Sequence, residues 1–126
     1  MSSEGDNPHK GVTGLRRIWL ALGYSRDGLR AAWRGEAAFR QLCLLAAVLL
    51  PLAFLLPVSR VERALMVAVV LLSLIIELLN SAIEAAIDRI SFERHPLSKA
   101  SKDMGSAAQL LGLTLIALVW LSILWP

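Results

Sequence analysis

Four polar residues recur at helical spacing within an otherwise apolar part of the chain. Glu77, Asn80, Glu84 and Asp88 lie at offsets of 0, 3, 7 and 11 residues, which an α-helix places within roughly 60° of arc on one face. Ionisable side chains at membrane depth are costly and usually mark a functional site. The alternatives are a ladder of interhelical hydrogen bonds and, for Glu84 and Asp88, simple solvation near the membrane surface.

Further acids can approach this stripe from other segments. Glu36 precedes the first long apolar segment and Asp103 precedes the third, so both can meet Glu77 and Glu84 near one membrane interface. Crowded carboxylates repel one another or take up protons, and a hard divalent cation, here expected to be Mg²⁺, removes that conflict. Because Mg²⁺ held by one or two carboxylates completes its shell with water and substrate phosphates, the cluster predicts a nucleotide site.

The remaining parts of a phosphoryl-transfer site are also in the sequence. Lys102 and the N-terminus of the third apolar helix would attract phosphates, since free helix amides bind anions. Glu77, the deepest carboxylate, is the candidate general base for an alcohol that arrives through the bilayer. The chemistry that needs these parts is transfer of a phosphoryl group from Mg·ATP to a lipid hydroxyl. The spacing makes this chemistry plausible without identifying it.

Three long apolar segments must position these residues. The chain has 126 residues, 56% of them hydrophobic, and a mean hydropathy of +0.61, which predicts a small all-α membrane protein with one domain over residues 1–126. We expect membrane helices at 36–57, 61–90 and 104–125, each near the ~20 residues that a span needs. Eleven Lys and Arg residues lie before the first span or between the second and third, against two in the first turn. The positive-inside rule then predicts a cytoplasmic N-terminus and an external C-terminus.

A basic segment precedes the spans. Residues 13–35 alternate apolar residues with arginines at helical spacing, which predicts an amphipathic surface helix with Gly23 as a candidate break point. Residues 1–12 are expected to be disordered. The pI of 9.6 is interpreted as membrane topology and attraction to membrane lipids, and no nucleic-acid partner is expected. The single Cys43 excludes a disulfide within the chain.

The sequences ELLNSAIEAAIDRI and HPLSKASKDMGSAAQ, with GLRAAW and GEAAFRQ before the first span, closely resemble the prokaryotic diacylglycerol kinase family. The resemblance covers nearly the whole chain from Arg17 onward. It implies a homotrimer of three-span subunits, each with a surface helix. It also implies that the protein makes phosphatidic acid from diacylglycerol and ATP at the cytoplasmic face of a bacterial inner membrane.

The resemblance also assigns roles to residues that match the family pattern. Glu77 becomes the catalytic base, and Glu36 and Glu84 become the ligands of Mg²⁺. The residues implied to contact ATP are Arg17, Tyr24, Glu36, Asn80, Glu84, Glu93, Arg94, His95, Lys102 and Asp103. Those implied to border the lipid substrate are Arg30, Trp33, Phe39, Arg40, Gln41 and Glu77.

Two other functions fit parts of this pattern. Relatives that phosphorylate undecaprenol, a long polyprenyl alcohol, present the same kind of hydroxyl at the interface, so undecaprenol is the alternative acceptor. A non-enzymatic trimeric ion pathway could also use an acidic stripe, but residues 61–72 of the second span are nearly all apolar, which disfavours conduction. The chain has neither a P-loop nor a kinase glycine-rich loop, so soluble-kinase motifs give no support.

Overall fold

The structure is a computed structural model that describes residues 14–126. Four helices make up this part: α1 (Gly14–Gly35), α2 (Ala37–Leu55), α3 (Arg60–Ile90) and α4 (Pro96–Leu124). No strand occurs between residues 14 and 126, which confirms the all-helical prediction. The expected disordered segment, residues 1–12, lies outside the described residues.

Three of the helices are long and apolar enough to cross a membrane, namely α2, α3 and α4. The chain is therefore a multi-pass membrane protein. With 31 residues, α3 is about 46 Å long at 1.5 Å per residue, against a hydrocarbon core of about 30 Å. At least one end of α3 must therefore project into the headgroup region or the water.

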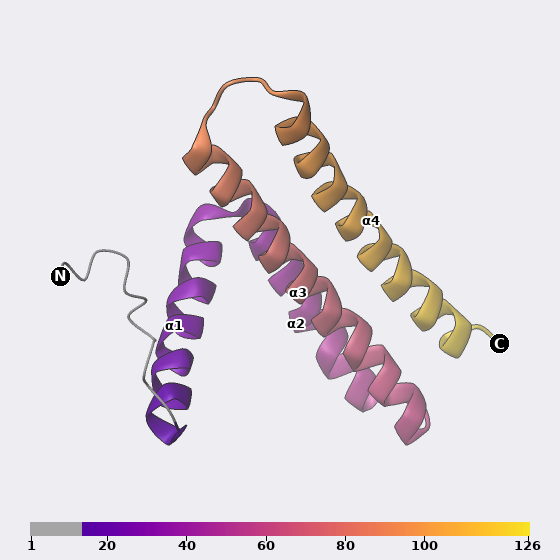
Figure 1. Cartoon of the computed structure of the whole chain (residues 1–126). Helices are drawn as coiled ribbons and strands as arrows, with labels where there is room; N and C mark the ends of the chain where they lie inside the picture. The colour runs from indigo at the N-terminus through magenta and orange to yellow at the C-terminus, as the bar shows by residue number, and fades with distance from the viewer. Residues whose placement is uncertain (1–13) are drawn as a thin grey trace.

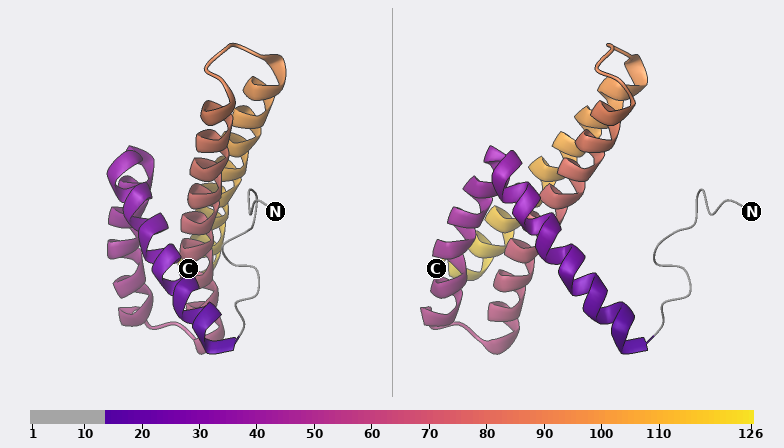
Figure 2. Two further views of the ribbon diagram at one scale, coloured as in Figure 1. Left: turned by 60° about the vertical axis from the view of Figure 1, so that its left-hand side comes forward. Right: turned by 90° about the vertical axis from the view of Figure 1, so that its left-hand side faces the viewer.

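α3 is the central helix of the arrangement. It packs against both α2 and α4, and Figure 1 shows α4 running back alongside it in the antiparallel direction. α1 and α2 diverge from the bend at Glu36 like an inverted V, most clearly in the right-hand view of Figure 2. The polar end of α3 and the start of α4 lie together at the end of the molecule that carries the α3–α4 loop (Figure 1).

The turn between α2 and α3 is held by specific hydrogen bonds. Ser59 and Glu62 form a capping box at the start of α3, with the Ser59 amide donating to Glu62 Oε1 at 3.0 Å and the Glu62 amide donating to Ser59 Oγ at 3.2 Å. Arg63 Nε donates to the Ala53 carbonyl at 2.9 Å. That carbonyl would otherwise face the nitrogen of Pro57, which has no hydrogen. α2 and α3 therefore form a helical hairpin.

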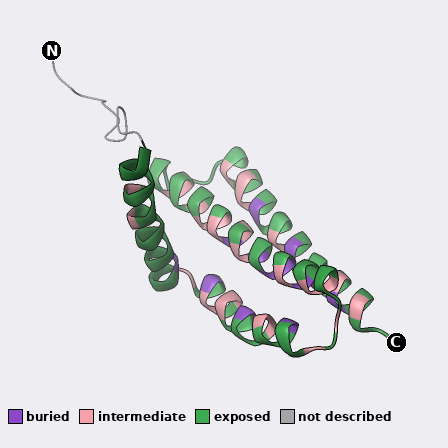
Figure 3. Ribbon diagram, turned by 90° about the horizontal axis from the view of Figure 1, so that it is seen from below, coloured by how far each residue is buried: buried purple, intermediate pink, exposed green. Residues whose placement is uncertain are grey.

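The apolar core lies away from the polar end of α3. Its buried members come from α2, α3 and α4, and they are Ala46, Ala53, Met66, Val69, Val70, Ile116 and Trp120. Trp120 Nε1 donates to the Met66 carbonyl at 3.2 Å, which ties α4 to α3 in this core. Figure 3 shows that burial is confined to inward strips of these helices, whereas α1 is almost entirely exposed.

Two local expectations differ from the structure. α1 is continuous through Gly23, so the candidate break does not occur. α4 begins at Pro96 and not at residue 104, because His95 and Pro96 form a helix start within what looked like a charged loop. The His95 side chain accepts a hydrogen bond from the Leu97 amide at 3.1 Å, and proline is favourable in the first helical turn.

Candidate active site

The polar stripe of α3 descends from a buried to a partly exposed environment. Glu77 is only 4% exposed, whereas Asn80, Glu84 and Asp88 are half-buried. Glu77 and Glu84 are seven residues apart, or about 10 Å along the helix axis. Along the stripe, the carboxylate of Glu77 is therefore enclosed between helices, whereas those of Glu84 and Asp88 are partly exposed nearer the end of α3.

Glu77 is held by residues of two helices. Gln109 of α4 donates from Nε2 to Glu77 Oε2 at 3.0 Å and to the Ser73 carbonyl at 3.3 Å. The Ser73 hydroxyl donates to Gln109 Oε1 at 3.3 Å. Ser73 is only 1% exposed, so the network is shielded from water.

Asn80 lies one turn from Glu77, where α4 comes unusually close. A methyl group at Gly105 would overlap the Asn80 carboxamide oxygen, so Asn80 keeps this orientation only because residue 105 is glycine. Asn80 Oδ1 is buried and, among residues 14–126, meets no hydrogen-bond donor. A buried acceptor of this kind is expected to have a partner in the working protein, and the next turn of the helix carries Glu84.

Charges from three segments converge on Glu84. The Glu36 carboxylate at the α1–α2 bend and the Lys102 ammonium of α4 both interact electrostatically with the Glu84 carboxylate, as do Glu77 and Asp88. Within the described residues, no three acids, histidines or cysteines gather tightly enough to form a metal site by themselves. Mg²⁺ commonly uses only one or two carboxylates and fills its remaining positions with water and phosphate oxygens. Glu36 and Glu84 fit that donor set.

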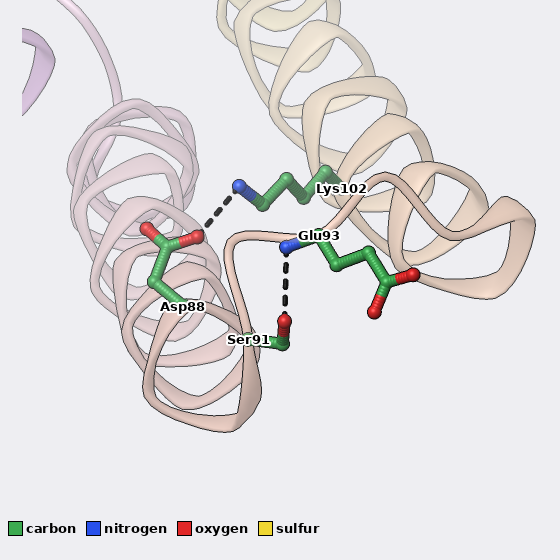
Figure 4. Close-up of polar contacts among 4 residues, drawn as sticks. All are labelled: Asp88, Ser91, Glu93 and Lys102. Carbon is green, nitrogen blue, oxygen red and sulfur yellow. Dashed lines mark hydrogen bonds and ion pairs between the residues drawn. The ribbon is translucent and has the colours of Figure 1, made fainter.

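Two ion pairs lie at the polar end of the helices. Lys102 Nζ lies 2.8 Å from Asp88 Oδ1 and joins α4 to α3, and Lys99 Nζ lies 2.6 Å from Asp103 Oδ2 within α4. Figure 4 shows the Lys102 side chain reaching across to Asp88. In the same view the Glu93 carboxylate points away from this pair, while its amide donates to Ser91 Oγ at 2.9 Å.

The α3–α4 loop and the helix ends beside it enclose a cavity of about 700 Å³. Its lining includes five of the residues expected at ATP, which are Glu93, Arg94, His95, Lys102 and Asp103. Asp88, Lys99 and Phe92 also line it. Glu36, Asn80 and Glu84, which were also expected at ATP, are not among its lining residues.

Residues expected from the N-terminal helix lie elsewhere. Arg17, Tyr24, Arg30 and Trp33 are exposed on α1, and none of them lines the cavity. At the start of α2, Phe39 is buried and Gln41 is exposed. Arg40 donates from Nη1 to the Trp33 carbonyl at 2.7 Å, so in this structure it satisfies the C-terminus of α1.

One source of phosphate attraction was placed wrongly. The free amides of the third span were expected beside Lys102, but the helix begins at Pro96, so the amides near Lys102 lie inside the helix. Lys102 itself remains at the cavity. The amides at the N-terminus of α4 that could attract an anion therefore lie in the turn after His95. One of them, the Leu97 amide, already donates to the His95 ring.

Gln109 is the contact that sequence reasoning missed. It is half-buried on α4 and binds the carboxylate expected to be the base. The available signal was its position, because a carboxamide among apolar residues of a membrane span is costly unless it has a partner. Its partner could not be identified without the register between α3 and α4.

Fold and site together define a small multi-pass membrane enzyme with an acid-and-lysine site where two of its spans meet. The chain belongs to the prokaryotic diacylglycerol kinase family, whose sequence profile matches residues 23–124. It is accordingly a kinase, and members of this class take phosphate from ATP.

Named relatives agree with this assignment. A diacylglycerol kinase of Pseudomonas aeruginosa is 68% identical over 118 residues, which cover 94% of this chain and 96% of the relative. The diacylglycerol kinase of Escherichia coli K12 is 48% identical over 114 residues, covering 90% and 93%. That of Haemophilus influenzae is 45% identical over 114 residues, covering 90% and 97%.

Proposed function

We propose that this chain transfers the γ-phosphate of ATP to the free hydroxyl of diacylglycerol, giving phosphatidic acid and ADP. The reaction takes place at the cytoplasmic face of a bacterial inner membrane, with the protein assembled as a homotrimer. Family membership and the names of the relatives support the reaction. The trimer and the orientation follow from the family resemblance and from the distribution of Lys and Arg.

The observation that carries the proposal is the burial of Glu77 on the same helix face as Glu84, near Lys102, a residue suited to binding phosphate. A carboxylate that is 4% exposed is shielded from bulk water, as a base that must not promote hydrolysis of ATP requires. Lys102, which lines the cavity, interacts electrostatically with Glu84. The acceptor hydroxyl and the phosphate donor would therefore approach the same stretch of α3 from opposite directions.

Glu77 acts as the general base. Its carboxylate takes the proton of the acceptor hydroxyl while that oxygen forms a bond to the γ-phosphorus, and the bond from the γ-phosphorus to the β,γ-bridging oxygen breaks to release ADP. Excluding water from Glu77 protects ATP from hydrolysis. Proton removal by a positioned side chain typically contributes 10²–10⁴-fold in rate.

Glu36 and Glu84 would hold Mg²⁺ together with the nucleotide phosphates. When bound, the cation neutralises the charge that develops on the transferring phosphoryl group. Lys102 must exchange its Asp88 partner for a phosphate oxygen if it is to contact ATP. Asn80, Asp103 and the loop residues Glu93, Arg94 and His95 complete the nucleotide side, with Arg17 and Tyr24 approaching from α1.

The lipid side is formed by α1 and the start of α2. Arg30 and Arg40 are cations suited to the interface, and the exposed Trp33 supplies apolar surface for acyl chains. Phe39, also expected at the lipid, is only 4% exposed in this structure. Gln41, exposed on the first turn of α2, offers a carboxamide to the glycerol group.

The test is lipid-dependent phosphorylation by purified protein in micelles, compared with Glu77→Gln. We expect Glu77→Gln to lower kcat by about 10²–10⁴-fold with assembly intact, because glutamine keeps the shape of the side chain but cannot take the proton. Glu62→Gln is the matched control, since glutamine also serves in a capping box, and it should retain full activity. A fully active Glu77→Gln enzyme would remove the base assignment.

The same assay decides the acceptor. Diacylglycerol and undecaprenol are supplied separately at equal concentration in the micelle, with ATP and Mg²⁺ constant. Faster phosphorylation of diacylglycerol is expected. A clear preference for undecaprenol would replace the acceptor, and ATP consumption without any lipid acceptor would contradict the lipid kinase function.

A further inference from the structure

We propose that Gln109 is a positioning residue that orients the carboxylate of Glu77 for proton abstraction, with Ser73 fixing the direction of the Gln109 amide. The inference rests on the proposed role of Glu77 as the base. It adds a residue of α4 to the surroundings of the base, which lies on α3.

Every polar atom of the Gln109 side chain is used in one consistent orientation. Nε2 donates to Glu77 Oε2 at 3.0 Å and to the Ser73 carbonyl at 3.3 Å, while Oε1 accepts from the Ser73 hydroxyl at 3.3 Å. If the amide were turned over, its oxygen would face the Glu77 carboxylate and its NH₂ group would face the Ser73 hydroxyl. The Glu77 carboxylate and the Ser73 carbonyl can only accept, so together they require the NH₂ group on their side, and the Ser73 hydroxyl donates to the amide oxygen that remains.

The backbone of α4 is shaped to bring Gln109 to this place. Gly105 and Gly112 lie four residues before and three residues after it and are both buried against α3. A Cβ at Gly112 would come within 3.1 Å of Gln109 Oε1 and 3.0 Å of Ile76 Cδ1. A larger residue at Gly112 would therefore displace the Gln109 carboxamide or the Ile76 side chain and disturb the hydrogen bond to Glu77.

Packing alone does not account for this network. Beyond Gly112, the next buried positions along α4 are Ile116 and Trp120, which lie in the apolar core, and an apolar side chain at residue 109 would continue that pattern. Replacing both partners of a buried hydrogen bond by apolar groups is often nearly neutral for stability. A polar trio at membrane depth is therefore better explained by the orientation it imposes on Glu77 Oε2, which leaves Oε1 as the oxygen available to the acceptor.

The effect should appear in turnover and not in nucleotide binding. Gln109→Met keeps an unbranched side chain of similar length but donates no hydrogen bond. We expect kcat to fall about 10- to 100-fold, the loss associated with a misplaced reacting group, while KM for ATP stays within about twofold. Ser73→Ala removes the hydroxyl that donates to Gln109 Oε1 but keeps the Ser73 carbonyl that accepts from Nε2, so its loss should be smaller. The double variant should be no worse than Gln109→Met alone.

Thr114→Val is the matched control on α4, because the Thr114 hydroxyl bonds only the Leu110 carbonyl of its own helix, at 2.8 Å. It should keep wild-type kcat. Size-exclusion chromatography and thermal unfolding in micelles are measured for every variant. If Gln109→Met is poorly folded, the Ser73→Ala result decides, with wild-type kcat counting against the inference.

Measuring Glu77→Gln in parallel separates two kinds of failure. An inactive Glu77→Gln together with a fully active Gln109→Met overturns only the positioning role. An active Glu77→Gln overturns the base assignment and this inference with it. A Gln109→Met enzyme with unchanged kcat but raised KM, or with additive losses in the double variant, would show that Gln109 acts through packing.

Discussion

At the scale of single residues, the site separates two tasks that acids can perform. Glu77 is enclosed by Ser73 and Gln109 and has one hydrogen-bond donor, an environment for moving a proton. Glu84 lies among the charges of Glu36, Lys102 and Asp88, an environment for holding a cation and phosphates. The same residue type thus serves two roles because its surroundings differ.

Removing one of the cation-binding charges should change the metal requirement. We predict that Glu84→Gln, or Glu36→Gln, raises the Mg²⁺ concentration for half-maximal activity about tenfold or more, because each deletes one anionic ligand of a hard cation. The measurement is activity against Mg²⁺ at saturating ATP and lipid. Glu62→Gln removes an acid from the far end of α3 and should leave the titration unchanged. Superimposable curves for Glu84→Gln and wild type would argue against the ligand role.

At the scale of the helices, the α2–α3 hairpin depends on Arg63. Its guanidinium bonds the carbonyls of Ala53 at 2.9 Å, Leu56 at 3.4 Å and Val58 at 3.5 Å. Ala53 lies in the last turn of α2, Leu56 is the C-cap and Val58 belongs to the turn, so none of these carbonyls accepts a regular intrahelical hydrogen bond. One cation at the start of α3 therefore completes the end of the preceding helix.

We predict that Arg63→Met destabilises the protein by about 1–3 kcal/mol, the usual cost of leaving buried acceptors unpaired. The free energy of unfolding is measured by denaturing-detergent titration in micelles. Arg60→Met removes an exposed arginine from the same helix turn and serves as control. Equal stabilities of the two variants would mean that water replaces the Arg63 hydrogen bonds at no cost.

How much could be predicted from the sequence is also clearest at this scale. The acidic stripe follows from the geometry of one helix, so residue spacing alone places Glu77, Asn80 and Glu84 on one face. The start of α4 was misplaced because Lys99, Lys102 and Asp103 resemble a loop in composition, although Pro96 is a usual residue for a first helical turn. The Gln109 contact depends on the register of two helices, which Gly105 and Gly112 determine only once the helices are packed.

At the scale of the whole molecule, the two connections between spans lie at opposite ends (Figure 1). The α3–α4 loop adjoins the cavity and the acids, and the α2–α3 turn adjoins the apolar core. If the nucleotide is cytoplasmic, the α3–α4 loop must lie inside the cell and the α2–α3 turn outside.

Labelling tests this orientation. In a Cys43→Ala background, Phe92→Cys and Val61→Cys place single thiols at positions that are 87% and 71% exposed in the structure. We predict that a membrane-impermeant maleimide labels Val61→Cys in spheroplasts, whereas Phe92→Cys reacts only after the membrane is opened. The reverse pattern would place the cavity outside and contradict the proposed orientation.

The early start of α4 couples the cavity to the bilayer itself. Lys99, Lys102 and Asp103 lie on the same 29-residue helix that crosses the hydrocarbon, with no intervening hinge. A mismatch between the length of a span and the thickness of the bilayer is relieved by tilting or shifting the span. Because α4 is continuous, its first turns move together with the part of the helix that lies in the membrane. Lipids of different chain length should therefore change the position of these side chains relative to ATP. The catalytic rate should then depend on the thickness of the membrane.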